Sequence, residues 1–206
     1  MTVLPQPLLA ARMLGLFALI GIGLVSLFFY ATDHRISQNQ HKELLLSLKT
    51  VLADTEYDND PTEDIMQVND IRLGTSDAVT LYRARIDGKI VATVIAATAP
   101  DGYNGNIKLL IAILADGQLA GVRVVAHKET PGLGDDIEAS RSHWILSFNG
   151  KSLGQPAEKQ WAVKRDGGDF DQFTGATITP RAVVKAVKNS LHYFAENKSL
   201  ILYDTP

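Results

Sequence analysis

The 206-residue chain contains no cysteine. Disulfides, thiolate-held iron–sulfur clusters and cysteine-ligated zinc are therefore excluded, so any redox chemistry requires a different cofactor. Histidine is also scarce, with five residues, and none stands at the spacing of a known metal motif. We expect no metal site.

The chain also lacks a strong charge of one sign. Its net charge of -3 gives no support for a nucleic-acid partner. Neither the glycine-rich dinucleotide fingerprint nor a Walker phosphate loop occurs. With 46% hydrophobic residues, the chain is long enough for one packed domain plus an appendage.

One stretch has no charge at all. Residues 13–31 are uncharged and mostly apolar, and as a helix they would reach roughly 28 Å, close to the hydrocarbon thickness of a bilayer. A cleaved signal peptide is the alternative, but the run is longer than a signal core and lacks a small-x-small cleavage site. We favour a single uncleaved transmembrane helix in contact with lipid, after a tail of residues 1–12. Basic residues flank both sides, so charge does not decide the topology.

The rest of the chain is expected to form a juxtamembrane helix and linker over residues 32–62 and one domain over residues 63–206. An apolar stripe predicts a helix from His41 to Ala53. Four β-rich runs form two pairs, each joined by a turn that contains glycine. The runs are Val79–Ile86, Lys89–Ala96, Lys108–Leu114 and Gln118–Ala126. Antiparallel hairpins with helices predict an α+β fold.

Four further elements follow from local patterns. Residues 99–106 are rich in turn formers and predict a loop, whose Tyr103 could cover a flat ring. Residues 137–148 predict a helix, and residues 160–164 predict a short strand. After Thr179 as N-cap and Pro180 as first helical residue, a helix is expected from Arg181 to about Asn197.

The stretch before that last helix combines small residues with hydroxyls. Gly175 and Ala176 leave room for a bulky reagent to approach the Thr177 hydroxyl. The positive end of the helix dipole lies beside it and favours a phosphate or carboxylate. An ordinary capping loop, threonine-rich because hydroxyls cap helices, is the alternative.

Three motifs resemble those of a known family. Asp171-x-x-Thr174-Gly175-Ala176-Thr177 resembles the flavinylation motif of the FMN-binding domains of bacterial respiratory complexes. The run Glu-Thr-Pro-Gly-Leu-Gly at 129–134 completes the pairing typical of that family. With the N-terminal span and Ala-Pro-Asp-Gly-Tyr-x-Gly at 99–105, the layout resembles the G-subunit family of Rnf ion-translocating oxidoreductase complexes.

The resemblance implies the site. FMN would be bound covalently through a phosphoester to Thr177. A separate flavin transferase, a transient partner, would recognise Asp171, Thr174, Gly175 and Ala176. Thr174, Gly175 and Ala176 would also lie against the cofactor.

Other contacts are expected from the loop and its surroundings. Thr130 and Leu133 would touch the ring or phosphate, and Gly134 would set the backbone. Lys164 would lie near the flavin, where a cation favours the reduced form. Glu129 would brace the loop, because a carboxylate is repelled by a phosphate.

The resemblance also implies a function. The domain would lie on the periplasmic side of a bacterial inner membrane and pass electrons between other subunits, without complete activity alone. The complex would couple electron exchange between NADH and ferredoxin to Na⁺ or H⁺ translocation. The alternatives are the C subunit of a Na⁺-pumping NADH:quinone reductase, and an anchored assembly module with a vestigial flavin site.

Overall fold

The structure is a computed structural model that describes residues 6–203, with only the backbone described for residues 6–9 and 31–41. The chain divides into two compact units, residues 1–44 and residues 45–206. We call the second unit the sheet domain.

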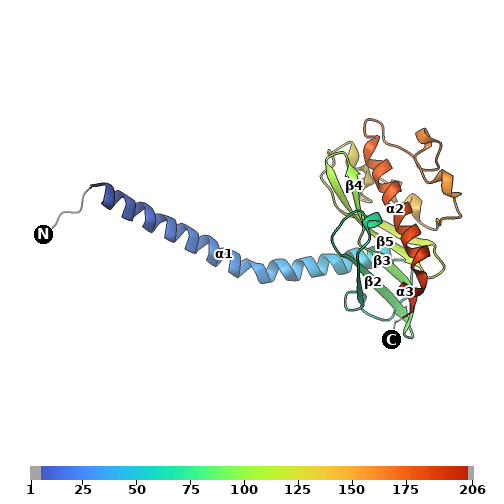
Figure 1. Ribbon diagram of the computed structural model, residues 1–206, viewed down its shortest axis with the longest axis horizontal. Coiled ribbons are helices and arrows are strands. Elements are labelled where there is room, and N and C mark those ends of the chain that lie inside the picture. The colour runs from blue at the N-terminus through green and yellow to red at the C-terminus, as the bar shows by residue number, and fades with distance from the viewer. Residues whose placement is uncertain (1–5, 204–206) are drawn as a thin grey trace. The chain divides into compact units, whose positions relative to one another are not determined.

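Helix α1 (Gln6–Val51) is continuous (Figure 1). The helix expected from His41 to Ala53 is therefore not separate, but forms the last turns of α1. Residues 32–42 contain neither proline nor glycine, so no residue in this stretch ends the helix. In the sheet domain, Leu48, Val51 and Leu52 are buried. Residues 54–62 form turns and irregular backbone, as expected.

The sheet domain is built on an antiparallel sheet of six strands. The strands are β1 (Ile65–Val68), β2 (Val79–Ile86), β3 (Lys89–Ile95), β4 (Thr98–Gly102), β5 (Gly105–Leu114) and β6 (Leu119–Ala126). Their order is β1-β2-β3-β5-β4, and β6 pairs with β5. The long β5 pairs with β3 at one end and with β4 at the other, so β6 occupies its opposite edge.

Both predicted hairpins are confirmed. Asp87 and Gly88 join β2 to β3 with φ of 49° and 75°, the pair of positive values that a type I′ turn requires. The loop expected at 99–106 is wrong, because β4 and β5 form a third hairpin around Tyr103 and Asn104. A Cβ on Gly102 would lie 2.2 Å from the Gly105 carbonyl oxygen, so this hairpin requires glycine there.

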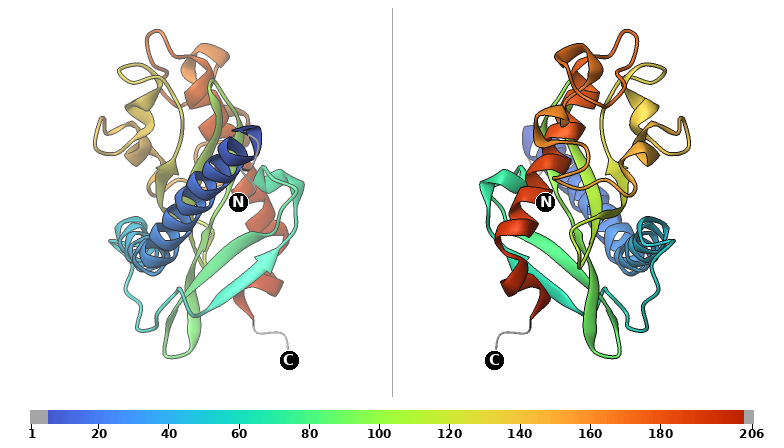
Figure 2. Two further views of the ribbon diagram at one scale, coloured as in Figure 1. Left: turned by 90° about the vertical axis from the view of Figure 1, so that its left-hand side faces the viewer. Right: turned by 90° about the vertical axis from the view of Figure 1, so that its right-hand side faces the viewer.

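Helix α2 (Ile178–Glu196) packs against β4 and β5 and covers one face of the sheet (Figure 2). Its predicted apolar stripe is confirmed as buried: Val183, Val184, Val187, Leu191 and Phe194. The predicted start is wrong, because Thr177 is the N-cap and Pro180 is the third helical residue. Proline is tolerated throughout the first turn, where the N–H groups have no intrahelical partner. A short helix, α3 (Lys198–Leu202), follows.

The segment between β6 and α2 contains no α-helix or strand, only short 3₁₀ turns and isolated bridges. The helix expected at 137–148 is wrong: η2 (Gly134–Ile137) and η3 (Trp144–Phe148) are separate. The Ser142 hydroxyl donates to the Asp136 carbonyl at 2.6 Å and accepts from the Trp144 N–H at 3.1 Å, which ends one turn and starts the next.

The strand expected at 160–164 is also wrong. Val163 lies between η4 (Glu158–Gln160) and η5 (Lys164–Asp166) and forms only an isolated bridge with Phe170. Alternating burial of Trp161 and Val163 produces a strand-like pattern without a neighbouring strand. An aromatic cluster holds this region together: Trp144, Phe148, Trp161, Phe170 and Phe173, with ring centroids 4.5–6.3 Å apart. One further turn, η1 (Ile71–Leu73), precedes β2.

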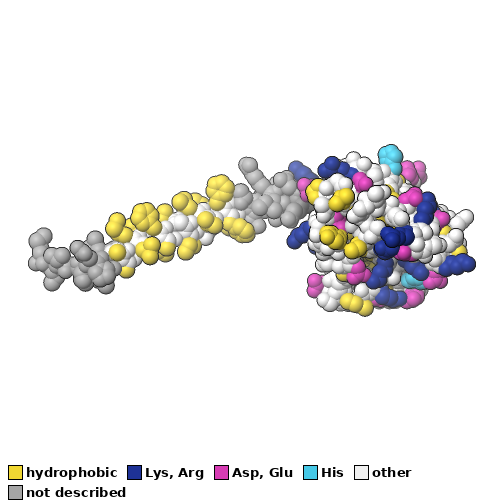
Figure 3. All heavy atoms as spheres, turned by 90° about the horizontal axis from the view of Figure 1, so that it is seen from above, with side chains coloured by type: hydrophobic (Ala, Val, Ile, Leu, Met, Phe, Trp, Pro, Cys, Tyr) yellow, Lys and Arg dark blue, Asp and Glu magenta, His cyan; other side chains and the backbone are white. Residues whose placement is uncertain are grey.

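One segment of the described residues is long and apolar enough to cross a membrane. It is Ala10–Tyr30 of α1, with a mean hydropathy of 2.3. Hydrophobic side chains lie along it, whereas charged side chains of both signs are scattered over the visible face of the sheet domain (Figure 3). The segment overlaps the expected membrane helix at 13–31.

Candidate functional site

A cavity of about 410 Å³ opens where three segments of the sheet domain meet. One is the β4–β5 turn, one is the loop at 129–134, and one is the start of α2. The lining residues are Tyr103, Glu129, Thr130, Leu133, Gly134, Gly175, Ala176, Thr177, Ile178 and Thr179. The volume is in the range of small-molecule sites.

Glu129 connects all three segments from the floor of the cavity. Its side chain is buried, with only 4% of the residue exposed. One carboxylate oxygen accepts from the Asn104 N–H at 3.0 Å, and the other accepts from the Tyr103 N–H at 3.3 Å and from the Thr179 hydroxyl. A buried carboxylate requires such donors, so Glu129 fixes the relative positions of the hairpin, the loop and the helix.

The 129–134 loop approaches the helix closely. The N–H groups of Leu133 and Gly134 donate to the Thr130 carbonyl at 3.1 and 3.0 Å, which makes a tight turn. A Cβ on Gly134 would lie 2.9 Å from the Glu129 Cβ and 3.0 Å from the Thr179 hydroxyl oxygen. Glycine is therefore required at 134 to bring the loop against the start of α2.

Thr177 stands at the mouth of the cavity as the N-cap of α2. Its hydroxyl makes no capping hydrogen bond, so the oxygen is available for other chemistry. Gly175, with φ of 85°, turns the backbone in a conformation that other residues rarely adopt. The positive end of the α2 dipole and the Arg181 guanidinium, 3.3 Å from the Thr177 carbonyl oxygen, lie beside it.

Seven of the residues expected at the site line this cavity: Tyr103, Thr130, Leu133, Gly134, Gly175, Ala176 and Thr177. Thr174 and Lys164 do not line it. The Lys164 ammonium instead pairs with the Asp171 carboxylate at 2.6 Å on the surface, and this hydrogen bond raises the pKa of Lys164. Asp171 and Thr174 are exposed next to the cavity, accessible to a partner protein.

Sequence reasoning missed two lining residues. The sequence predicts no role for Ile178, and the capping position predicted for Thr179 belongs to Thr177. Tyr103, Leu133 and Ile178 are 66%, 42% and 44% exposed. Large apolar side chains exposed around one opening are suited to a flat aromatic ligand. An isolated isoleucine in a threonine-rich run carries no signal of this kind.

The arrangement fits a ligand with an aromatic ring and an anionic group. Tyr103, Leu133 and Ile178 offer apolar contact to a ring. The start of α2 beside Thr177 offers N–H groups and positive potential to a phosphate. FMN combines both chemical features.

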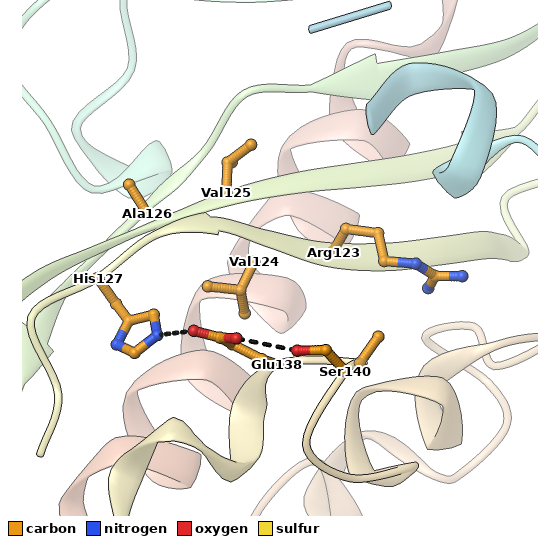
Figure 4. A pocket seen from close by; sticks show the side chains of 8 residues that line it. Arg123, Val124, Val125, Ala126, His127, Glu138 and Ser140 are labelled. Atoms are coloured by element: carbon orange, nitrogen blue, oxygen red, sulfur yellow. Dashed lines mark hydrogen bonds and ion pairs between the residues drawn. The ribbon is translucent and has the colours of Figure 1, made fainter. Parts of the chain in front are cut away.

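A second cavity, of about 480 Å³, lies beside β6 (Figure 4). It is lined by Arg123, Val124, Val125, Ala126, His127, Glu138, Ala139 and Ser140. His127 Nε2 lies 2.7 Å from a Glu138 carboxylate oxygen, and His127 Nδ1 accepts from the Glu129 N–H at 3.0 Å. The hydrogen bond from His127, followed by that from Ser140, lowers the pKa of Glu138. This cavity therefore adjoins the 129–134 loop.

Comparison with known proteins supports the same interpretation. The FMN-binding domain family matches residues 102–192, and the RnfG N-terminal region matches residues 8–51. The G subunit of the ion-translocating oxidoreductase complex of Pseudomonas aeruginosa (strain UCBPP-PA14) is 50% identical over 193 residues, which cover 93% of this chain and 90% of that protein.

The G subunits of the same complex from Shewanella baltica (strain OS223) and Vibrio cholerae (strain M66-2) are also similar. The first is 50% identical over 92% of this chain and 90% of that protein. The second is 46% identical over 90% of this chain and 88% of that protein.

Proposed function

Because the chain belongs to the G-subunit family of ion-translocating oxidoreductase complexes, we propose that it carries FMN bound covalently to Thr177. An FMN-binding domain in such a subunit supports an electron-transfer role in the complex. The observation that carries the proposal is the position of Thr177. Its uncapped hydroxyl lies at the mouth of a cavity that the three family motifs line together.

Two groups of residues would hold the cofactor, one at its ring and one at its phosphate. Tyr103, Leu133 and Ile178 would contact the ring, and the first turn of α2 would stabilise the phosphate. When bound, FMN supplies the redox chemistry, and the protein positions it. Thr174 and Lys164 lie outside the cavity lining, so any influence on the flavin would act from its edge.

Attachment requires a second protein. A flavin transferase would use FAD: a bond forms between the Thr177 hydroxyl oxygen and the FMN phosphorus, the pyrophosphate bond breaks, and AMP leaves. The hydroxyl proton passes to a base on the transferase. Asp171 and Thr174 are exposed beside Thr177 and would be recognised together with Gly175 and Ala176. A diester keeps the flavin on the protein in a compartment where lost cofactor is not replaced.

The apolar helix Ala10–Tyr30 and the similarity to subunits of an ion-translocating complex both fit a membrane-anchored protein. We place the sheet domain on the periplasmic side of a bacterial inner membrane, with α1 in contact with lipid. The complex would couple electron exchange between NADH and ferredoxin to Na⁺ or H⁺ translocation, and this subunit alone would have no complete activity. Ferredoxin-dependent ion uptake by membrane vesicles, with and without this subunit, tests the coupling.

The attachment is tested by flavin fluorescence after denaturing electrophoresis, since only covalent flavin survives denaturation. The full chain, purified from cells that contain the transferase, is expected to fluoresce, and the peptide that holds Thr177 should carry the mass of FMN. A dark band from such cells would leave an anchored assembly module with a vestigial site, and would overturn the proposal.

A further inference from the structure

Strand β6 has a free edge. It pairs with β5 on one side, and at its start Leu119 exchanges backbone hydrogen bonds of 2.8 Å with Lys151 and Gly150. Beyond that point, within residues 6–203, no backbone hydrogen bond joins residues 123–126 to any segment other than β5. An unpaired strand edge is a template for another strand.

The edge is bordered by a groove. The second cavity has β6 residues 123–127 along one wall and residues 138–140 along the other. Figure 4 shows Val124 and His127 pointing from the strand towards the side where Glu138 and Ser140 lie. The contact from His127 to Glu138 closes one end, so the groove follows the strand for roughly four residues, about 13 Å.

The other end of the groove holds an unpartnered donor. The Arg123 Nε is buried and has no hydrogen-bond partner in the described part of the chain. The terminal nitrogens of Arg123 donate to the Val122 carbonyl at 2.8 Å and the Thr50 carbonyl at 3.3 Å. The positive guanidinium of Arg123 lines this end of the groove, so an occupant of the groove should bring a carboxylate oxygen to it.

The opposite edge of the sheet is protected. Strand β1 has four residues, and Asp64 just before it forms ion pairs of 2.5 Å with Arg83 and Arg85. Short length and charge are common protections against strand addition. Strand β6 has eight residues, no proline, and exposed Val125 and Ala126 near its end.

We propose that the free edge of β6 is the docking site for an extended segment of another subunit of the oxidoreductase complex, which enters the groove as an additional strand. Such a segment supplies backbone partners to the edge and an acceptor to Arg123. A second copy of this chain fits less well, because β6 contains no acidic residue and would bring another arginine. The proposal does not depend on the attachment of FMN to Thr177.

Site-specific photo-cross-linking in the assembled complex tests the proposal. A photoreactive residue at Val125 is compared with one at Ile65 on the opposite edge, since the two residues are 46% and 47% exposed. We expect Val125 to yield a covalent adduct with another subunit, at least about tenfold above Ile65, as for a residue at a buried interface. Equal yields, no adduct, or an adduct only with lipid or a second copy of this chain would overturn the proposal.

A groove-filling substitution gives a second test. Ala139→Trp places an indole in the groove, and Ala157→Trp, at an exposed position away from it, is the matched control. We expect Ala139→Trp to reduce the co-purified subunits by about tenfold or more, while its covalent flavin stays at the control level. Normal assembly of a folded Ala139→Trp chain would contradict the proposal. If that variant does not fold, the cross-linking result decides.

Discussion

The hydroxyl of Thr179, in the first turn of α2, donates a hydrogen bond to the carboxylate of Glu129, which lies 50 residues earlier in the chain. Both residues are buried, with exposures of 0% and 4%. The same carboxylate accepts the N–H groups of Tyr103 and Asn104. One side chain therefore fixes the floor of the cavity before any ligand is bound.

Removal of this hydrogen bond should destabilise the sheet domain. Thr179→Val leaves a buried carboxylate oxygen with one donor fewer, and the expected cost is about 1–3 kcal/mol in the free energy of unfolding. Thr80→Val, which removes a partly buried hydroxyl that accepts a solvent-exposed hydrogen bond from the Gln67 amide at 2.9 Å, should change this free energy less, by about 0.5 kcal/mol. Urea unfolding of the full chain in detergent measures both. Equal effects would show that the Thr179 hydroxyl has no special role.

Loss of the Thr177 hydroxyl should abolish the attachment without unfolding the domain. Thr177→Ala removes the attacking oxygen, but no capping hydrogen bond, so its effect on stability should be small. Fluorescence of the denatured band reports covalent flavin, and the urea midpoint reports the fold. Thr177→Ser keeps the hydroxyl and should retain flavin. Acid-precipitable flavin in the alanine variant would show that the attachment site is elsewhere.

The positive charge of Arg181, close to Thr177, should favour the attachment of FMN. Its guanidinium contacts the Thr177 carbonyl and is held by Asp166 at 2.6 and 2.8 Å, so its charge is fixed close to the expected phosphate. Arg181→Gln should lower the rate of flavin transfer in a purified transferase reaction. Lys185→Gln, which breaks a similar pair with Asp101 one turn later, is the control. The same rate for both variants would assign Arg181 a purely structural role.

The sequence predicts the regular parts of the fold well. Runs of apolar and β-branched residues predict β2, β3, β5 and β6, and the Asp87-Gly88 turn between β2 and β3 requires backbone values that few residue pairs adopt. Residues 137–148 show the limit. Their spacing is helical, but the Ser142 hydroxyl bonds to nearby backbone groups and interrupts the helix, a local competition that apolar periodicity does not reveal.

The candidate site also combines features that the sequence predicts with features that it does not. The resemblance to the FMN-binding domain family implies that the 129–134 and 171–177 segments share one site, and residues of both segments line one cavity. The resemblance does not predict that Lys164 pairs with Asp171 outside the cavity lining, since this depends on the 3₁₀ turn at 164–166. Nor does it predict the buried contact of Thr179 with Glu129, which requires the packing of α2 on the sheet.

Gly134→Ala should displace the 129–134 loop or the start of α2, which line the cavity. An added methyl group would lie 2.9 Å from the Glu129 Cβ and 3.0 Å from the Thr179 hydroxyl, so the loop or the helix must move, at a cost of about 1–3 kcal/mol. Gly154→Ala is the control, because no atom lies within 4 Å of its added Cβ and its φ is not positive. Urea unfolding reports stability, and the absorption spectrum of the bound flavin reports its surroundings. Two variants with the same midpoint and spectrum would contradict the close approach.

Acid should weaken the contact that links the β6 groove to the 129–134 loop. The hydrogen bond from His127 lowers the pKa of Glu138 below its ordinary value of 4.5. A lowered carboxyl pKa contributes stability that is complete above the unfolded pKa and is lost as the pH falls through the folded value. The urea midpoint of the full chain should therefore decrease as the pH is lowered from about 5 to about 3.

Glu138→Gln should make this decrease shallower, whereas Glu63→Gln, at an exposed glutamate before β1, should leave it unchanged. Identical pH profiles for the two variants would show that the His127–Glu138 contact contributes nothing to stability.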